Sequence, residues 1–380
     1  MISKIKNAIK NRIKNAPAKN IILMESTPDF SDNTKAVYDE LIKRGVNKKY
    51  KIVWVVNPSF KIDKKDKNVE FLPYDKEKRN RKLSYYNLVA KCKICCNQFL
   101  TSQKEGQFSI YLSHGTGIKS IKNYYNVPNN IDCCLSAGEG VKELMAYEFN
   151  YDVNKMVALG FPRNDVLCQN LKLPQGLFDN KYDKVIVWYP TFRQHKGAGK
   201  VTASQNALPI INDVDKAKQL NEVAKQKNVL IVLKPHFAQD VSYIKDLSLS
   251  NILFIDDSFF AKNKISSYEF VGGCDALITD YSSIYYDYTL CDRPIALIWE
   301  DVEEYKKKPG LVDGYEYLTQ GGEKIYTIDE LKGFIERVAN GEDLLKTERR
   351  FIRDLTNYSN DGKSSKRVVD YLLEKINYRG

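Results

Sequence analysis

The feature that most constrains the fold is a recurrent pattern of short aliphatic runs separated by stretches with helical spacing. The first series of runs begins at 20–24 and 51–56, and the second begins at 184–189 and 229–233. Runs of Val, Ile and Leu are typical of strands that are buried on both faces, as in parallel sheets covered by helices. The chain is therefore predicted to be α/β, with two doubly wound parallel sheets.

The whole chain follows this alternation. Strands are predicted at 20–24, 51–56, 69–72, 92–96, 108–112, 131–135, 157–159, 184–189, 229–233, 252–255, 276–278 and 294–298. Helices are predicted at 34–44, 139–149, 214–227 and 283–291, and only helices are expected after Ile328. The 380 residues are long for one hydrophobic core and suit two domains of roughly 150–200 residues each. The two series meet near the polar segment 169–182.

Positive charge is concentrated at the N-terminus. The chain carries 59 Lys+Arg against 48 Asp+Glu, a net charge of +11, and residues 1–20 hold six basic residues and no acidic one. Isoleucines in this segment share one helical face with lysines around it, which suits the surface of an anionic membrane. A helix packed on the protein body, a frayed end and a nucleic-acid arm are the alternatives, the last without interleaved aromatic residues. The membrane interpretation assigns lipid contact to Lys4, Lys6, Ile9, Lys10, Ile13 and Lys14.

Three further classes of protein are disfavoured. No run approaches the roughly 18–20 apolar residues that cross a bilayer, and the first residues lack the apolar stretch and cleavage site of a secretory signal. Eight cysteines lie mostly in short apolar runs, as expected for reduced thiols in a cytoplasmic protein. Cys92 and Cys95 have C-x-x-C spacing, but no second pair or histidine stands at ligand spacing, so no metal site is predicted.

Polar clusters follow five of the predicted strands. They lie at 113–119, 160–165, 190–193, 234–236 and 279–283, and two of the three histidines, His114 and His236, belong to them. In doubly wound sheets the ligand binds outside the carboxyl ends of the strands. These clusters are therefore the candidate site.

The cluster after 108–112 has two glycines that permit close backbone approach, while Thr116 and Lys119 supply donors. Such a loop can hold phosphate oxygens or can be a plain turn. It is not a Walker loop, because Ile118 stands where the glycine before Lys-Ser would be, and Ser120 breaks the G-x-G-x-x-G pattern.

The other clusters supply charge and helix ends. Residues 280–283 resemble a helix N-cap with hydroxyl and N–H groups aimed at an anion, and ordinary capping is the alternative. Arg163, Arg193 and Lys234 add cations, and His236 is either a site residue or a core histidine. Together the clusters suit a diphosphate and the removal of a proton from an attacking hydroxyl. The paired carboxylates of glycoside hydrolysis and a nucleophile elbow are both missing.

The order of these motifs resembles the CDP-glycerol glycerophosphotransferase family, the primases and polymerases of teichoic acid and capsule synthesis. The motifs are His114-Gly115-Thr116-Gly117-Ile118-Lys119, Gly160-Phe161-Pro162-Arg163-Asn164-Asp165, Tyr189-Pro190-Thr191-Phe192-Arg193, Lys234-Pro235-His236, Thr279-Asp280-Tyr281-Ser282-Ser283 and Asp361-Gly362-Lys363-Ser364-Ser365-Lys366-Arg367. Two departures, Ser113 in place of an aromatic residue and Phe237 in place of a proline, concern the acceptor and the polyol more than the reaction class.

The resemblance implies a GT-B fold, with two Rossmann-like domains facing across a cleft and a C-terminal helix crossing back. The implied parts are a basic membrane-surface helix (1–19), an acceptor domain (20–175), a nucleotide domain (176–355) and the crossing helix (356–380).

The resemblance also implies the reaction. Glycerol phosphate would move from CDP-glycerol to a hydroxyl of a polyprenyl-diphosphate-linked saccharide, with release of CMP, at the cytoplasmic face of the cell membrane. CDP-ribitol as donor, a GT-B glycosyltransferase using a nucleotide sugar, and a non-catalytic binder are the alternatives. No cofactor is expected, and no metal is required because the cations and the helix dipole can neutralise the diphosphate. No nucleic-acid partner is expected either.

Residue roles follow from the same resemblance. His114 is expected to be the general base and His236 to act at the donor diphosphate, although the two can exchange roles. Asp280 or Asp287 would contact ribose or polyol hydroxyls, or only orient the helix. The residues assigned to the donor are Gly115, Thr116, Lys119, Arg163, Asn164, Thr191, Arg193, Lys234, Asp280, Ser282, Ser283 and Asp287.

Overall fold

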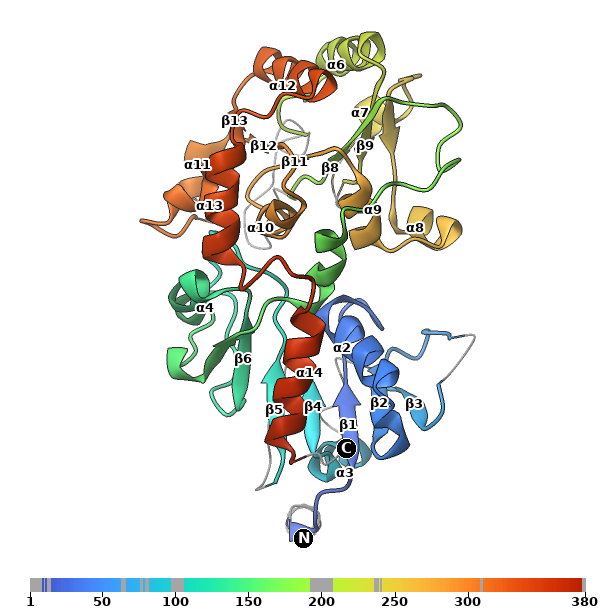
Figure 1. Ribbon diagram of the computed structural model, residues 1–380, viewed down its shortest axis with the longest axis vertical. Coiled ribbons are helices and arrows are strands. Elements are labelled where there is room, and N and C mark those ends of the chain that lie inside the picture. The colour runs from blue at the N-terminus through green and yellow to red at the C-terminus, as the bar shows by residue number, and fades with distance from the viewer. Residues whose placement is uncertain are drawn as a thin grey trace. The chain divides into compact units, whose positions relative to one another are not determined.

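The computed structural model describes residues 9, 11, 15–62, 66–75, 78, 82–96, 106–191, 208–235, 239, 241–307 and 310–377 (Figure 1). The chain forms two compact units. Unit 1 contains Met1–His114, Lys122–Asp165 and Asp361–Gly380, and unit 2 contains Gly115–Ile121 and Val166–Asn360. The division after Asp165 lies closer to the N-terminus than the boundary assigned from the sequence, and the glycine loop belongs to unit 2.

Unit 1 is built on a parallel sheet whose seven strands lie in the order β3-β2-β1-β4-β5-β6-β7. The strands are β1 (Ile21–Met24), β2 (Lys51–Val56), β3 (Val69–Pro73), β4 (Ile94–Cys96), β5 (Phe108–Tyr111), β6 (Cys133–Ser136) and β7 (Met156–Ala158). The helices are α2 (Asp32–Lys43), α3 (Leu83–Lys91), α4 (Lys142–Glu148) and α14 (Ser364–Lys375), with short 3-10 turns η1 (Val46–Lys48), η3 (Glu139–Val141), η4 (Val153–Lys155) and η5 (Pro162–Gln169), the last of which runs on into unit 2.

The aliphatic runs form this sheet as strands that are largely buried. Ile22 of β1 pairs with Ile52 of β2 on one side and with Ile94 of β4 on the other. On one face Leu23 and Val53 pack with side chains of α3, including Tyr85 and Val89, in a buried cluster. At the end of the chain α14 returns to this unit and packs against α2 (Figure 1).

Unit 2 has a parallel sheet of six strands in the order β10-β9-β8-β11-β12-β13. The strands are β8 (Lys184–Trp188), β9 (Val229–Leu233), β10 (Ile252–Phe254), β11 (Ala276–Thr279), β12 (Ile295–Ile298) and β13 (Glu323–Ile325). The helices are α6 (Val214–Gln226), α7 (Ser242–Lys245), α8 (Asp257–Asn263), α9 (Ser267–Gly273), α10 (Ile284–Tyr288), α11 (Val302–Lys307), α12 (Ile328–Asn340) and α13 (Lys346–Thr356), with η6 (Thr289–Cys291) and η7 (Glu316–Thr319).

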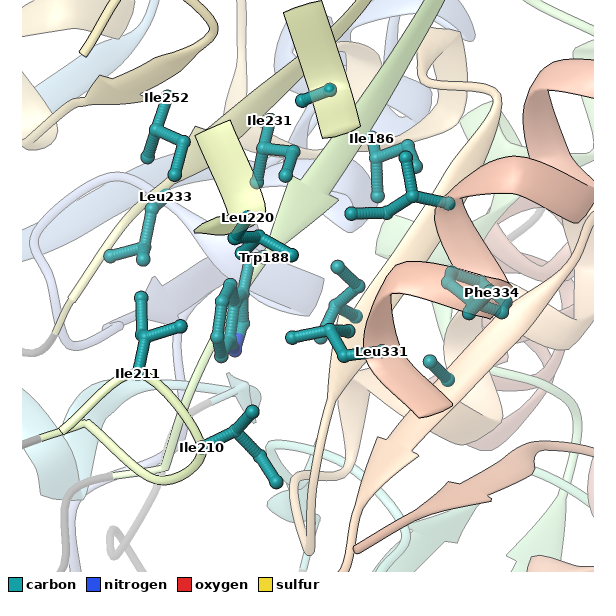
Figure 2. Packing of buried hydrophobic residues seen from close by; sticks show 14 of the residues in the cluster. Ile186, Trp188, Ile210, Ile211, Leu220, Ile231, Leu233, Ile252, Leu331 and Phe334 are labelled. Atoms are coloured by element: carbon teal, nitrogen blue, oxygen red, sulfur yellow. The ribbon is translucent and has the colours of Figure 1, made fainter. Parts of the chain in front are cut away.

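The core of unit 2 joins the sheet to two helices on one face. Figure 2 shows Trp188 of β8 among Leu220 of α6 and Leu331 and Phe334 of α12. Helix α6 also contacts α12 directly. Helix α12 begins in a capping box in which the Thr327 hydroxyl accepts from the Glu330 N–H. A polar cap followed by apolar residues at helical spacing fixes both the start of the helix and its buried face.

Both strand orders are those of a doubly wound Rossmann sheet, which confirms the predicted fold class. In each sheet the order reverses beside the first strand, between β1 and β4 and between β8 and β11. Ligands of such sheets bind at the carboxyl ends of the strands at this reversal. The sequence did not predict β13, a short strand with only one buried residue, or the helices α3, α7, α8, α9 and α11.

No helix within the described residues combines the length and apolar character needed to cross a bilayer. All eight cysteines are free thiols, including Cys92 and Cys95, which lie in the buried cluster of unit 1. Burial raises the pKa of the Cys96 and Cys134 thiols well above its ordinary value. A buried neutral thiol is a poor nucleophile and a poor metal ligand.

Candidate functional site

The carboxyl ends of β8 and β11 are tied together at the reversal of the unit 2 sheet. The backbone N–H of Thr191, after β8, donates to Asp280 Oδ2 at 2.8 Å, and the Thr191 hydroxyl donates to the other oxygen of the same carboxylate. The Thr279 hydroxyl donates to the carbonyl oxygen of Tyr189 at 2.7 Å. Two of the polar clusters found in the sequence therefore form one rigid corner at the position where such sheets bind ligands.

The glycine loop is docked at this corner. The Lys119 ammonium lies 3.2 Å from the Thr191 hydroxyl oxygen. The Val312 N–H donates to the carbonyl oxygen of Ile118 at 2.8 Å, which holds the loop against a neighbouring segment. A Cβ atom at Gly117 would lie 3.9 Å from the Cβ of Ser283, so this part of the loop runs beside the start of α10. Three of the five clusters thus meet within unit 2.

The serines of this corner are not helix caps of the expected kind. Ser283 precedes α10 with a helical backbone, and its side chain makes no capping hydrogen bond. The Ser282 carbonyl oxygen accepts from the Tyr285 N–H at 3.2 Å. Helix α10 passes directly into η6, so the helical segment predicted at 283–291 is present, but the Ser283 side chain does not cap it.

The other donor residues of unit 2 differ in their surroundings. Lys234, after β9, forms an ion pair with the exposed Asp257 at 3.1 Å and lies 5.9 Å from the Tyr189 ring. Asp287 is buried and accepts a hydrogen bond from the Tyr268 hydroxyl at 2.6 Å. Thr116 is also buried, whereas Lys234 is partly exposed. Asp287 and Thr116 therefore lie in the packing of the site and not on its surface.

A second polar cluster lies in unit 1, around His114. Its Nδ1 atom is 3.3 Å from Asp32 Oδ2, while the guanidinium of Arg163 donates to Asp32 Oδ1 at 2.8 Å. Burial alone would raise the pKa of Asp32, but the positive charge of Arg163 and the hydrogen bond with His114 bring the pKa below its ordinary value. Asp32 is therefore ionised at neutral pH, and the His114 side chain beside it is 41% exposed.

Asn33 binds the two loops that carry His114 and Arg163. Its amide nitrogen donates to the carbonyl oxygens of Leu112 and Ser113 at 3.0 and 3.1 Å. Its amide oxygen accepts from the backbone N–H of Arg163 at 3.1 Å. Asp32 and Asn33 were not predicted as site residues, although they follow β1, the strand at which the order of the unit 1 sheet reverses. A loop of several residues separates them from the strand, so the sequence did not indicate that they lie at its carboxyl end.

The motif at 160–165 binds the motif at 361–367. The carboxylate of Asp165 accepts from the backbone N–H groups of Ser364 and Ser365, at 2.6 and 2.8 Å, at the start of α14. The Arg367 side chain donates to the carbonyl oxygen of Leu159 at 2.9 Å. Asn164 is buried here. These contacts dock α14 on unit 1, so part of what looked like a ligand motif holds the fold together.

Several predicted residues lie outside the described part of the chain. His236 and Arg193 are among them, and so are all the predicted lipid contacts except Ile9, which is exposed. Arg163 and Asn164 belong to unit 1, whereas the other described residues assigned to the donor belong to unit 2. Nowhere in the described residues do three or more His, Cys, Asp or Glu side chains gather in a way that would hold a metal ion.

Comparison with known families resolves the class of protein. The profile of the family described as CDP-glycerol:poly(glycerophosphate) glycerophosphotransferase matches residues 9–374. The chain belongs to this family. The assignment agrees with the resemblance drawn from the motifs.

Curated relatives of this family member are enzymes of teichoic acid synthesis. It is 26% identical to a teichoic acid poly(glycerol phosphate) polymerase of Staphylococcus epidermidis, over 73% of this chain and 40% of that protein. It is also 26% identical to a poly(ribitol-phosphate) polymerase of Bacillus spizizenii, over 93% of this chain and 56% of that protein. A glycerol-phosphate primase of Bacillus subtilis is 24% identical, over 67% of this chain and 61% of that protein. The chain thus spans only part of the length of these relatives.

A solved structure of the wall teichoic acid polymerase TagF has the same fold. It superimposes with a TM-score of 0.71 at 20% identity and covers 99% of this chain and 95% of that chain. A variant of TagF soaked with CDPG gives a TM-score of 0.69. At this level of identity the similarity shows the fold, which confirms the expected GT-B class with two Rossmann-like units.

Proposed function

We propose that this chain transfers a polyol phosphate from a CDP-polyol to a hydroxyl group of an acceptor and releases CMP. The observation that carries the proposal is the family profile, which spans nearly the whole chain. CDP-glycerol is the proposed donor. CDP-ribitol is the second candidate, because a poly(ribitol-phosphate) polymerase matches 93% of this chain.

The donor is assigned to the corner at the carboxyl ends of β8 and β11. Lys119 lies there next to Thr191, whose hydroxyl and N–H are held by Asp280. The ammonium of Lys119 and the hydroxyls of the nearby serines suit the oxygens of a diphosphate. Lys234 is a second cation, and a diphosphate would replace the exposed Asp257 as its partner. Asp280 acts by orienting Thr191, because its two oxygens are both engaged by that residue.

The proposed step is an in-line displacement. The acceptor oxygen forms a bond to the phosphorus that bears the polyol, the bond from this phosphorus to the bridging oxygen breaks, and CMP leaves. The proton of the acceptor hydroxyl passes to His114, which is exposed enough to meet a substrate. Negative charge spreads over the phosphoryl oxygens, so fixed cations stabilise the transition state. His236 and Arg193 are proposed to bind the diphosphate as well, and no metal or cofactor is required.

The proposed acceptor is a polyprenyl-diphosphate-linked saccharide at the cytoplasmic face of the cell membrane. The basic segment 1–20, with its isoleucine stripe, supports a peripheral contact with anionic lipid. A protein lacking residues 1–20 is expected to bind anionic vesicles more weakly and to turn over a soluble acceptor at the parental rate. Loss of both properties would show that the segment is structural, and unchanged vesicle binding would show that lipid is contacted elsewhere.

A donor panel tests the reaction class. The full chain is incubated with a lipid-linked disaccharide and with CDP-glycerol, CDP-ribitol, a UDP-sugar or a CMP-sugar, and released nucleotide is measured. CMP release from a CDP-polyol is expected, with a loss of at least ~10²-fold in His114→Ala because the base is missing. Nucleotide release from a sugar donor alone would indicate a glycosyltransferase, and parental activity of His114→Ala would remove the proposed base.

A further inference from the structure

We propose that Asp32 is a positioning residue for His114: it holds the proton on Nδ1 and so leaves Nε2 as the atom that accepts the proton of the acceptor hydroxyl. The inference deepens the proposed function and depends on it. Asp32 acts through the imidazole and does not touch substrate.

The two oxygens of Asp32 have separate partners. Oδ1 accepts from the Arg163 guanidinium at 2.8 Å and from the Asn33 N–H at 2.6 Å. Oδ2 lies 3.3 Å from His114 Nδ1. Because two donors occupy one oxygen, the carboxylate cannot rotate without losing both of them. Its second oxygen therefore faces the imidazole.

The backbone supports this orientation. Asp32 has a φ of 61°, in the left-handed region that Asp and Asn adopt more readily than most residues. Asn33, the next residue, binds the carbonyl oxygens of Leu112 and Ser113 directly before His114. The start of α2 thus fixes both members of the pair, the carboxylate and the loop that carries the imidazole.

The charge of Asp32 decides the tautomer of His114. Burial and the opposing effects of Arg163 and His114 leave the pKa of Asp32 below its ordinary value, so the group is a carboxylate at neutral pH. A carboxylate only accepts hydrogen bonds, so the facing Nδ1 must be the donor and carry the proton. The ring of Tyr111 also lies against the imidazole, 6.1 Å away edge to face, and its hydroxyl is bonded to that of Tyr125.

Replacement of the carboxylate by an amide should reverse the tautomer. In Asp32→Asn the amide oxygen is expected to stay with the two donors, Arg163 and the Asn33 N–H. The amide NH₂ then faces Nδ1 and donates to it, which moves the imidazole proton to Nε2 and removes the base. Asparagine tolerates a left-handed backbone, so the substitution leaves the local conformation in place.

The kinetic test compares Asp32→Asn with Asp39→Asn, a matched substitution on the exposed face of α2 where Asp39 pairs with Lys35. For Asp32→Asn we expect kcat for CMP release to fall ~10²- to 10⁴-fold and KM to change by less than about threefold. Asp39→Asn should behave as the parent. Parental kcat in Asp32→Asn would overturn the proposal.

A double substitution separates positioning from a structural ion pair with Arg163. If Asp32 acts through His114, then Asp32→Asn adds little to the defect of His114→Ala, because the imidazole it serves is gone. If the two defects multiply, Asp32 acts by another route and the proposal is wrong.

Nitrogen-15 NMR of histidine-labelled protein reads the tautomer without any activity. The chain has three histidines, so the His114 signals can be assigned by their loss in His114→Ala. The parent should show a protonated Nδ1 in the neutral ring, and Asp32→Asn should show a protonated Nε2. The same tautomer in both proteins would refute the inference. If no polyol phosphate is transferred, the proposed function fails, while this spectrum still tests the Asp32–His114 pair.

Discussion

The docking of α14 on unit 1 depends on one carboxylate, and Asp165→Ala removes it. Asp165 accepts from the first two N–H groups of the helix, Ser364 and Ser365, at 2.6 and 2.8 Å. Lys363, at the N-cap position of α14, supplies no side-chain capping bond. Asp165 is therefore a cap contributed by a distant part of the chain.

The size of the effect follows from these contacts. Loss of an N-cap side chain costs about 1 kcal/mol, and removal of a negative charge from a helix N-terminus costs a further ~0.3–1 kcal/mol. Because two short charge-assisted bonds disappear together, we expect about 2 kcal/mol, or a roughly 30-fold increase in the population in which α14 is undocked. Asp165→Asn keeps an acceptor oxygen and loses the charge, so it should show about half of this free-energy change.

Hydrogen exchange measured by mass spectrometry tests this expectation. Peptides from α14 in Asp165→Ala should exchange about 30-fold faster than in the parent, while peptides from the β8–β9 region of unit 2 should not change. Asp354→Asn, which alters an exposed carboxylate on α13 paired with its neighbour Arg353, is the matched control. Exchange of α14 within twofold of the parent in Asp165→Ala would refute the assigned role of the carboxylate.

Three further predictions concern the polar clusters. Gly160→Ala places a methyl group against the Ser364 side chain of α14 at a φ of 81°, so its thermal unfolding should begin at a lower temperature than that of Asp165→Asn. A Tm equal to that of the parent would contradict this packing. The ionised form of Asp32 stabilises unit 1, because its pKa is lowered in the folded protein. In urea titrations at each pH, the difference in free energy of unfolding between the parent and Asp32→Asn should be constant above about pH 5 and shrink as the pH falls below about 4. A difference that grows as the pH falls would show that the ionised carboxylate does not stabilise the folded state. Thr191→Val removes the hydroxyl that links Lys119 to Asp280, so KM for the CDP-polyol should rise about tenfold, while KM of Thr191→Ser stays near that of the parent. Equal KM values in the two variants would show that the hydroxyl plays no part in donor binding.

The fold was readable from the sequence because each strand is a short aliphatic run. β2, β8 and β9 are fully or almost fully buried, so their residues had to be apolar on both faces. β13 escaped prediction because only Ile325 of its three residues is buried and the other two are Glu323 and Lys324. A strand whose side chains are largely accessible to solvent needs no aliphatic run.

The site was predicted in part. Parallel strands end at one edge of a sheet, which is why Thr191 and Asp280 could be expected to meet. The sequence did not show that 160–165 contacts α14, because a short motif does not indicate which distant segment of the chain it packs against. Asp32 was missed for a related reason: it is separated from β1 by a loop, and its partners His114 and Arg163 lie far along the chain.

The most direct test of the transfer reaction is the mass of the product formed from CDP-glycerol and a defined lipid-linked disaccharide, compared between the parent and His114→Ala. We expect the parental product to be heavier than the acceptor by whole glycerol phosphate units joined through a phosphodiester, with CMP formed in equal amount, and His114→Ala to yield at least ~10²-fold less of it in the same time. A product heavier by a sugar, or an acceptor of unchanged mass after CMP has been released, would contradict it.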